Sequence, residues 1–178
     1  MENCVTQYWK ILWACSLLLF MRVGSAEAAG YDAFFDTSFG DYSEELVRAR
    51  EEGKKGILLF FEMKDCPFCH RMKETVLNQL QVQQYFKKHF LSFIVDIEGG
   101  LDITDFSGKE MTQQDFAQRQ NRVRATPVIQ IYDLQGKRVV RFTGATSGVE
   151  EFMWLGEYVV SGAYKEMPFV VYKRQRRR

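Results

Sequence analysis

The feature that most constrains the fold is a pair of cysteines, Cys66 and Cys69, placed directly after the apolar run at residues 57–61. A continuous apolar run of this length is typical of a central strand that is covered on both faces. From Pro67 onward the pattern is helical, and a proline is tolerated in the first turn of a helix because its missing N–H would have no partner there. The two thiols are therefore expected where a buried strand leads into a helix.

This placement favours thiolate chemistry at the first cysteine. The unpaired backbone N–H groups at the start of a helix, together with the helix dipole, stabilise a negatively charged sulfur at Cys66. A thiolate attacks disulfides, and two cysteines separated by two residues can close a small disulfide. We therefore expect dithiol–disulfide exchange at this pair. Cys66 is the expected attacking thiol because it lies nearer the helix start and is expected to be the more exposed of the two.

The same residues also match a different kind of site. C-P-F-C-H, from Cys66 to His70, has the C-x-x-C-H spacing of covalent c-type haem attachment, in which His70 would be an axial iron ligand. A strand-like segment leads into the motif, and the chain has many β-branched and aromatic segments that a small helical cytochrome does not need. We expect no metal, no cofactor and an exposed helical position for His70, with a small c-type cytochrome as the alternative.

The composition fits a single globular domain. The chain has 178 residues, of which 46% are hydrophobic and 15% are aromatic, and this is enough for one packed core. The formal net charge is +1, so no strong overall field marks a nucleic-acid-binding protein. We expect the basic run at residues 173–178 to be a short solvated tail, with a weak contact to anionic lipid as the alternative.

Residues 1–28 have the pattern of a secretory signal. Lys10 supplies the positive charge, residues 11–21 are apolar, and Ala26 and Ala28 give the small-x-small pattern of a cleavage site. The apolar run is short for a membrane span. We expect cleavage after Ala28, a domain at residues 29–178 and a periplasmic location, with an uncleaved anchor as the alternative.

Cleavage would also remove Cys4 and Cys15, which leaves Cys66 and Cys69 as the cysteines of the mature chain. A structural zinc site normally needs four ligands from two paired clusters, and the sequence has no second cysteine cluster. A disulfide-stabilised mini-protein would need several bridges. One C-x-x-C pair is too local to join distant elements, so a redox role is expected.

Periodicity and turn signals predict the other elements. A helix starts at Asp41 or Ser43, directs Leu46 and Val47 toward the core and stops at Gly53. The remaining expected elements are a helix from Pro67 that carries Met72, Val76 and Leu80, a short helix with Val82, a strand at residues 91–96, a loop at 97–108, a helix from Thr112 to near Asn121, a hairpin with strands at 128–132 and 138–142, and a helix at about 147–160. Because a helical crossover joins the strands at 57–61 and 91–96, these two strands are expected to be parallel.

Two motifs carry a resemblance to a known family. They are F-F-E-M-K-D-C-P-F-C-H-R-M at residues 60–72 and V-R-A-T-P-V-I-Q-I-Y-D-L-Q-G-K at residues 123–137. The second motif places Pro127 at the start of a strand, where a proline is tolerated and is often cis. With these motifs the whole mature chain resembles the thioredoxin superfamily. The resemblance implies an α/β protein with the thioredoxin fold, a central mixed β-sheet flanked by helices.

The resemblance also implies roles for particular residues. Cys66 and Cys69 match the nucleophilic and resolving thiols of a thiol–disulfide oxidoreductase. Pro127 matches a cis proline, and the backbone of the residue before it, Thr126, would pair with the substrate peptide. The expected substrate-binding residues are Thr126, Pro127, Pro67 and Phe68.

The long interval between the motifs is similar to that of the exported branch of thioredoxin-like proteins that includes SoxW. This narrower resemblance implies a protein that reduces disulfides of exported proteins and is kept reduced by a thiol-reducing donor in the membrane. A monomer is expected. Nucleic acid is not an expected partner. A disulfide donor or isomerase of the same fold, and a peptide-binding module that uses its thiols little, are the alternatives.

The chain departs from cytosolic thioredoxin at its active site. Pro-Phe replaces Gly-Pro between the cysteines, and Asp65 replaces the tryptophan before the first cysteine. Asp65 disfavours the thiolate by like charge, whereas Lys64 favours it. Phe60 stands where thioredoxin has a buried acid that assists proton transfer. Glu62, at the same strand end, is the candidate for that proton transfer, with a simple surface acid as the alternative.

Overall fold

A computed structural model of the chain describes residues 30–177. The predicted signal at residues 1–28, with Cys4 and Cys15, lies outside the described residues. Within them, one central sheet has the strand order β2-β1-β5-β6. The strands are β1 (Gly56–Glu62), β2 (Phe90–Asp96), β5 (Val128–Tyr132) and β6 (Arg138–Thr143). β1 pairs with β2 in parallel and with β5 antiparallel, so the sheet is mixed, as predicted.

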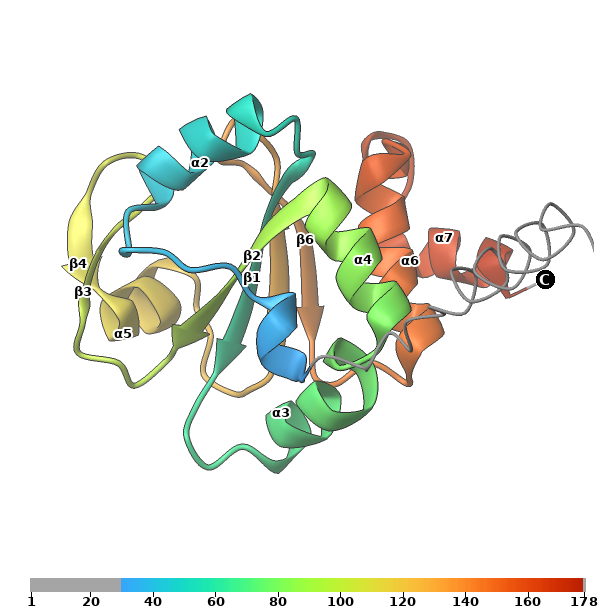
Figure 1. Cartoon of the computed structure of the whole chain (residues 1–178), viewed down its shortest axis with the longest axis horizontal. Coiled ribbons are helices and arrows are strands. Elements are labelled where there is room, and N and C mark those ends of the chain that lie inside the picture. Colours follow the sequence, from blue (N-terminus) through green and yellow to red (C-terminus); the bar gives the residue numbers. More distant parts are fainter. Residues whose placement is uncertain (1–29, 178) are drawn as a thin grey trace, which may run out of the picture.

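Helices cover both faces of this sheet (Figure 1). They are η1 (Tyr31–Phe34), α2 (Tyr42–Glu51), α3 (Pro67–Met72), η2 (Lys73–Leu77), α4 (Leu80–His89), α5 (Gln113–Asp115), η3 (Phe116–Gln120), α6 (Val149–Val160), η4 (Ala163–Lys165) and α7 (Phe169–Arg176). η1 and η4 are 3-10 helices, and η2 and η3 are π-helical segments. α4 and α6 lie on one side of the sheet, and α2 and α5 lie on the other (Figure 1).

The alternation of side chains along β1 creates two apolar cores. Leu58 and Phe60 pack with residues of α3, α4 and α6, whereas Leu59 and Phe61 pack with residues of α2 and η3 on the opposite face. All four side chains are completely buried. The continuous apolar run therefore forms a central strand because both of its faces are covered. The same alternation places Glu62 on the face of Phe60, which is the face that carries the cysteines.

Several helix predictions are confirmed at their ends. Asp41 caps α2, since its Oδ1 accepts hydrogen bonds from the backbone N–H groups of Ser43 and Glu44 at 2.8 and 3.0 Å. Gly53, two residues beyond α2, has a φ of +66°, a left-handed conformation that glycine adopts at little cost. Thr112 caps α5 by accepting a hydrogen bond from the N–H of Asp115 at 3.1 Å.

Four sequence predictions need correction. The loop predicted at residues 97–108 contains the first strand of a hairpin, β3 (Asp102–Thr104), which pairs with β4 (Glu110–Thr112). The helix after Cys66 passes into η2, and Leu80 begins α4 instead of extending the earlier helix. Val47 was expected in the core but is 48% exposed. The first two errors share one cause, because these segments are short enough for tertiary contacts to override their local pattern.

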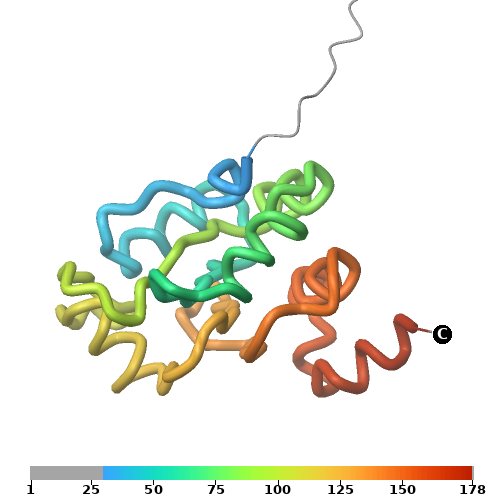
Figure 2. The backbone as a smooth tube through the Cα atoms, turned by 90° about the horizontal axis from the view of Figure 1, so that it is seen from below, coloured from blue at the N-terminus to red at the C-terminus, as the bar shows by residue number. Residues whose placement is uncertain are grey.

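The fourth correction concerns the basic C-terminus. Residues 173–176 form the second half of a helix, α7, although residues 174–176 are exposed, and Figure 2 shows α7 (red) at one edge of the molecule. α7 packs against α6: Lys173 pairs with Glu151, and Arg176 pairs with Glu157. Its apolar side chains add ring contacts, with Phe169 5.4 Å and Tyr172 5.2 Å from Tyr158 between ring centroids. Across residues 30–177, no helix has the length and apolar character to cross a membrane.

Candidate active site

The two cysteines occupy the start of α3, as predicted. Cys66 is the N-cap residue and Pro67 is the first helical residue. A disulfide joins Cys66 to Cys69, whose Cα atoms are 5.2 Å apart. The Sγ atom of Cys66 also accepts a hydrogen bond from the backbone N–H of Cys69 at 3.1 Å. A helix-start N–H is therefore aimed at the first sulfur, and the same donor would stabilise a thiolate there.

The cysteines are less exposed than the sequence suggested. Cys66 is 6% exposed and Cys69 is 2% exposed, so Cys66 is the more exposed of the two, but both are buried in this disulfide-bonded form. Phe60, which is completely buried, packs in the same apolar cluster as the two cysteines. Phe68 projects outward and is 56% exposed, with the Arg71 guanidinium 5.2 Å from its ring centroid. The disulfide thus packs in a cluster with the buried ring of Phe60, while the ring of Phe68 between the two cysteines is exposed to solvent.

The predicted substrate-binding segment lies at the same end of the sheet. The Thr126–Pro127 peptide bond is cis, as the resemblance implied. In the antiparallel register, Val128 lies opposite Phe61, near the end of β1 that leads to Cys66. Figure 1 shows α3 and the chain entering β5 at this common end. Pro127 is buried, and its carbonyl accepts a hydrogen bond from the N–H of Gly144 at 2.9 Å.

Thr126, the residue before this proline, is half-buried. Its hydroxyl oxygen is enclosed, and no described residue forms a hydrogen bond with it. The sequence predicted Thr126 as a substrate-pairing residue, and its place beside the end of β1 is compatible with that role.

Glu62 forms an ion pair with Lys73 at the end of β1. Its carboxylate lies 2.7 and 2.8 Å from Nζ of Lys73, and the two side chains are only 18% and 14% exposed. The Lys73 ammonium also lies 5.0 Å from the ring centroid of Tyr31. The backbone N–H of Lys73 donates to the carbonyl of Cys69 one helical turn earlier. The structure therefore brings this charge pair to the turn of helix that follows the second cysteine.

His70 is exposed on α3, as predicted. The described residues include no group of three or more His, Cys, Asp or Glu side chains that would hold a metal ion. The sulfur atoms of Cys66 and Cys69 are bonded to each other, an arrangement that leaves neither sulfur for a thioether bond to haem. The geometry therefore favours exchange over the haem-attachment interpretation of this motif.

Arg141 on β6 was not predicted from the sequence. Its Nη1 donates to the carbonyl oxygen of Asn121 at 2.7 Å, and its Nη2 donates to that of Arg122 at 3.2 Å. Burial and the neighbouring charge of Arg138 lower the pKa of Arg141 from its usual value. Asn121 and Arg122 precede the Thr126–Pro127 segment in the connection from η3 to β5. Local sequence carries no signal for such a contact, because it depends on how β6 pairs with the rest of the sheet.

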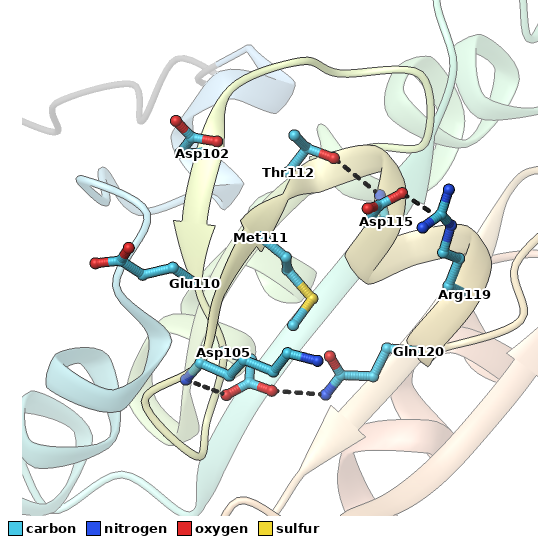
Figure 3. A pocket seen from close by; sticks show the side chains of 9 residues that line it. Asp102, Asp105, Glu110, Met111, Thr112, Asp115, Arg119 and Gln120 are labelled. Atoms are coloured by element: carbon cyan, nitrogen blue, oxygen red, sulfur yellow. Dashed lines mark hydrogen bonds and ion pairs between the residues drawn. The ribbon is translucent and has the colours of Figure 1, made fainter.

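A surface pocket lies away from the cysteines, between the β3–β4 hairpin and the α5–η3 helix (Figure 3). Its volume is about 1020 Å³, and none of the residues predicted for the site lines it. Asp105 accepts hydrogen bonds from Ser107, from the N–H of Lys109 and from Gln120. Burial alone would raise the pKa of Asp105, but these hydrogen bonds lower it overall. Asp105 therefore organises this hairpin, and we assign the pocket no part in the site.

A family model described as a thioredoxin-like domain matches residues 42–159. A thioredoxin-fold protein from Helicobacter pylori has a TM-score of 0.66 at 22% identity, covering 83% of this chain and 94% of that chain. The DsbH oxidoreductase has a TM-score of 0.55 at 20% identity, with the same 83% and 94% coverage. A Thermus thermophilus thioredoxin has a TM-score of 0.53 at 21% identity, covering 67% and 84%. A search of curated proteins gave no match.

Proposed function

The chain belongs to the thioredoxin-like domain family, and from this premise we propose that it is a thiol–disulfide oxidoreductase acting on protein substrates. The observation that carries the proposal is the Cys66–Cys69 disulfide at the start of α3, with the Cys69 N–H directed at the Cys66 sulfur. A binding module that used its thiols little would have no need of this arrangement. The DsbH oxidoreductase and the thioredoxin among the structural neighbours agree with it at the level of the fold.

The reaction proceeds by two exchanges. In the reduced protein, the Cys66 thiolate attacks one sulfur of a substrate disulfide, forms a mixed disulfide and releases the other substrate sulfur as a thiolate. Cys69 then loses its proton and attacks the Cys66 sulfur. This step releases the second substrate thiolate and forms the Cys66–Cys69 disulfide, so the substrate gains the two electrons that the dithiol loses. During both exchanges, the backbone of Thr126 pairs with the substrate peptide, and Pro67 and Phe68 contact it.

In the second exchange, Glu62 accepts the proton that the Cys69 thiol loses. Phe60 carries no titratable group, whereas Glu62 lies on the same face of β1 as the cysteines. Lys73 contacts both carboxylate oxygens of Glu62 and follows Cys69 by one helical turn. A carboxylate held in this position is suited to accept a proton and return it to solvent.

Substitution of the two cysteines tests the order of attack. Cys69→Ser should accumulate mixed disulfides with substrate proteins, because the mixed disulfide at Cys66 can no longer be resolved. Cys66→Ser should accumulate few, since the attacking thiolate is gone. Non-reducing gels with mass spectrometry of the trapped species measure both. Equal accumulation by the two variants would contradict the assignment of Cys66 as the nucleophile.

The direction and location of the reaction complete the proposal. The signal-like pattern of residues 1–28 supports a periplasmic location for the domain at residues 29–178. The SoxW-like interval between the motifs supports a reductant of exported proteins that is renewed by a thiol-reducing donor in the membrane. Equilibration with glutathione should give a potential nearer roughly −270 mV, the value of thioredoxin, than about −120 mV, the value of a strong oxidant. The latter would identify a disulfide donor. An intact Met1 on protein recovered from the cytoplasm would contradict export.

A further inference from the structure

The connection from η3 to β5 contains a backbone conformation that needs outside support. Arg122 has a φ of +53°, and it is the one non-glycine residue with a positive φ among the described residues. A side chain on this left-handed backbone meets steric strain, so the conformation persists only where the surroundings fix it. Arg122 lies four residues before Thr126. The direction in which the chain leaves this turn therefore decides where the Thr126 backbone lies.

Part of this support comes from Arg141 on the neighbouring strand β6, in addition to the hydrogen bonds that hold Asn121 to Phe116 and Tyr132. Its guanidinium donates to the carbonyls of two consecutive residues, Asn121 and Arg122, which lie on either side of the Arg122 Cα atom. Such a planar donor pair matches two adjacent carbonyls in a way that a lysine ammonium does not. If the turn relaxed to a right-handed or extended conformation, these two carbonyls would no longer face Arg141 together.

The rest of the connection is anchored at its two ends. The N–H of Val123 donates to the carbonyl of Ala117 at 2.8 Å, and the Val123 side chain is completely buried. At the other end, the carbonyl of Pro127 accepts from Gly144. Arg124 and Ala125 between these anchors are exposed. The backbone conformation at Arg122 consequently determines the direction that these exposed residues take.

We propose that Arg141 is a positioning residue for substrate binding: it holds the left-handed turn at Arg122 and thereby fixes the backbone of residues 123–126 in the orientation that pairs with a substrate peptide. The inference rests on the proposed function, in which Thr126 makes that pairing. Arg141 itself touches neither cysteine nor substrate. Its loss should therefore weaken the binding of extended substrates without slowing chemistry at the sulfur atoms.

The test compares a protein substrate with a small one. Arg141→Gln should raise the KM for reduction of insulin about tenfold and leave kcat within about twofold, because the groove is no longer preorganised. Reduction of hydroxyethyl disulfide, which is too small to use the groove, should be unchanged. Arg141→Lys, which keeps the charge but has a single donor nitrogen, should have an intermediate KM. The control is Arg119→Gln, which removes the same charge from an 82% exposed side chain paired with Asp115 and should match the wild type.

A second substitution separates positioning from general destabilisation. Arg122→Gly relieves the strain of the left-handed turn, so the double variant Arg122→Gly with Arg141→Gln should recover most of the KM. An equal loss on insulin and hydroxyethyl disulfide, an unchanged KM in both Arg141 variants, or a double variant no better than Arg141→Gln would each overturn the inference. A wild-type protein that reduces neither substrate would instead overturn the proposed function on which the inference rests.

Discussion

At the scale of single residues, the carboxylate of Glu62 lies on the cysteine-bearing face of β1 and is bound by Lys73. Glu62→Gln keeps the shape of the side chain but removes its ability to take a proton. We expect resolution of the mixed disulfide by Cys69 to slow about 10- to 100-fold at neutral pH, with the loss shrinking at higher pH, where the thiol ionises unaided. Rapid-mixing measurement of substrate release gives this rate. A pH profile unchanged from the wild type would contradict the proton-transfer role.

His89 gives a second residue-scale prediction, on stability. Burial, followed by the charges of Lys88, Lys55 and Lys54, lowers its pKa from the usual value. The unfolded chain therefore takes up a proton at His89 more readily than the folded protein. Stability should fall as the pH drops through about 6.5, with a slope from this residue of at most about 1.4 kcal/mol per pH unit. His89→Gln should flatten the dependence seen by urea unfolding. An equal slope in the variant and the wild type would contradict this.

At the scale of elements, the contact between α4 and α6 depends on Gly156. A Cβ atom at this position would lie 2.9 Å from ring atoms of Phe86 and Tyr85, and Phe86 is completely buried. Alanine favours a helix by about 1 kcal/mol over glycine, but overpacking a core typically costs about 1–3 kcal/mol. We expect the cost of overpacking to exceed the gain in helix propensity, so that Gly156→Ala lowers the free energy of unfolding. A stability above that of the wild type in urea would show that α4 moves aside.

The attachment of α7 to α6 is also testable. Burial alone would raise the pKa of Glu151, but bonds from Lys173 and from the N–H of Ser147 lower it overall. A carboxylate whose pKa is lowered by folding stabilises the folded state at any pH above its pKa in the unfolded chain. This contribution is lost as the pH falls through the pKa that the group has in the folded protein. Glu151→Gln should therefore cost about 1–2 kcal/mol at neutral pH, and this cost should shrink progressively as the pH falls below 4.5, the ordinary pKa of the carboxyl group.

Limited proteolysis at neutral pH should release α7 faster from Glu151→Gln than from the wild type, because Lys173 loses its partner. The exposed residue Glu150 on the same helix offers a matched control, Glu150→Gln, which should not change the rate. Equal cleavage of all three proteins would contradict the role of the Glu151 pair in holding α7.

The sequence predicted those elements whose signals are local. The central strands could be predicted because they are long and apolar, and α2 and α5 because Asp41 and Thr112 are good caps. β3 and β4 could not, since they are three residues long and mostly not buried, with no alternation to detect. α7 was missed because its basic residues resemble a solvated tail until Glu151 and Glu157 are seen to face them.

The same distinction holds within the site. Cys66, Cys69 and Pro127 belong to contiguous motifs, so their positions at the start of a helix and before a strand could be predicted from the sequence. The Glu62–Lys73 pair joins a strand to the end of a helix, and Arg141 reaches a turn about twenty residues away in the chain. Such contacts arise only when the sheet register is in place. Supporting residues of a site are therefore harder to predict than its reactive ones.

At the scale of the whole molecule, the account requires that the purified protein catalyse electron transfer to a protein disulfide. Turbidimetric reduction of insulin by dithiothreitol, with a catalytic amount of the chain, measures this directly. We expect the wild type to accelerate precipitation of the insulin B chain, and Cys66→Ser to leave the rate at that of dithiothreitol alone. A wild-type rate equal to the uncatalysed rate, with a folded protein and an intact Cys66–Cys69 pair, would contradict the central claim.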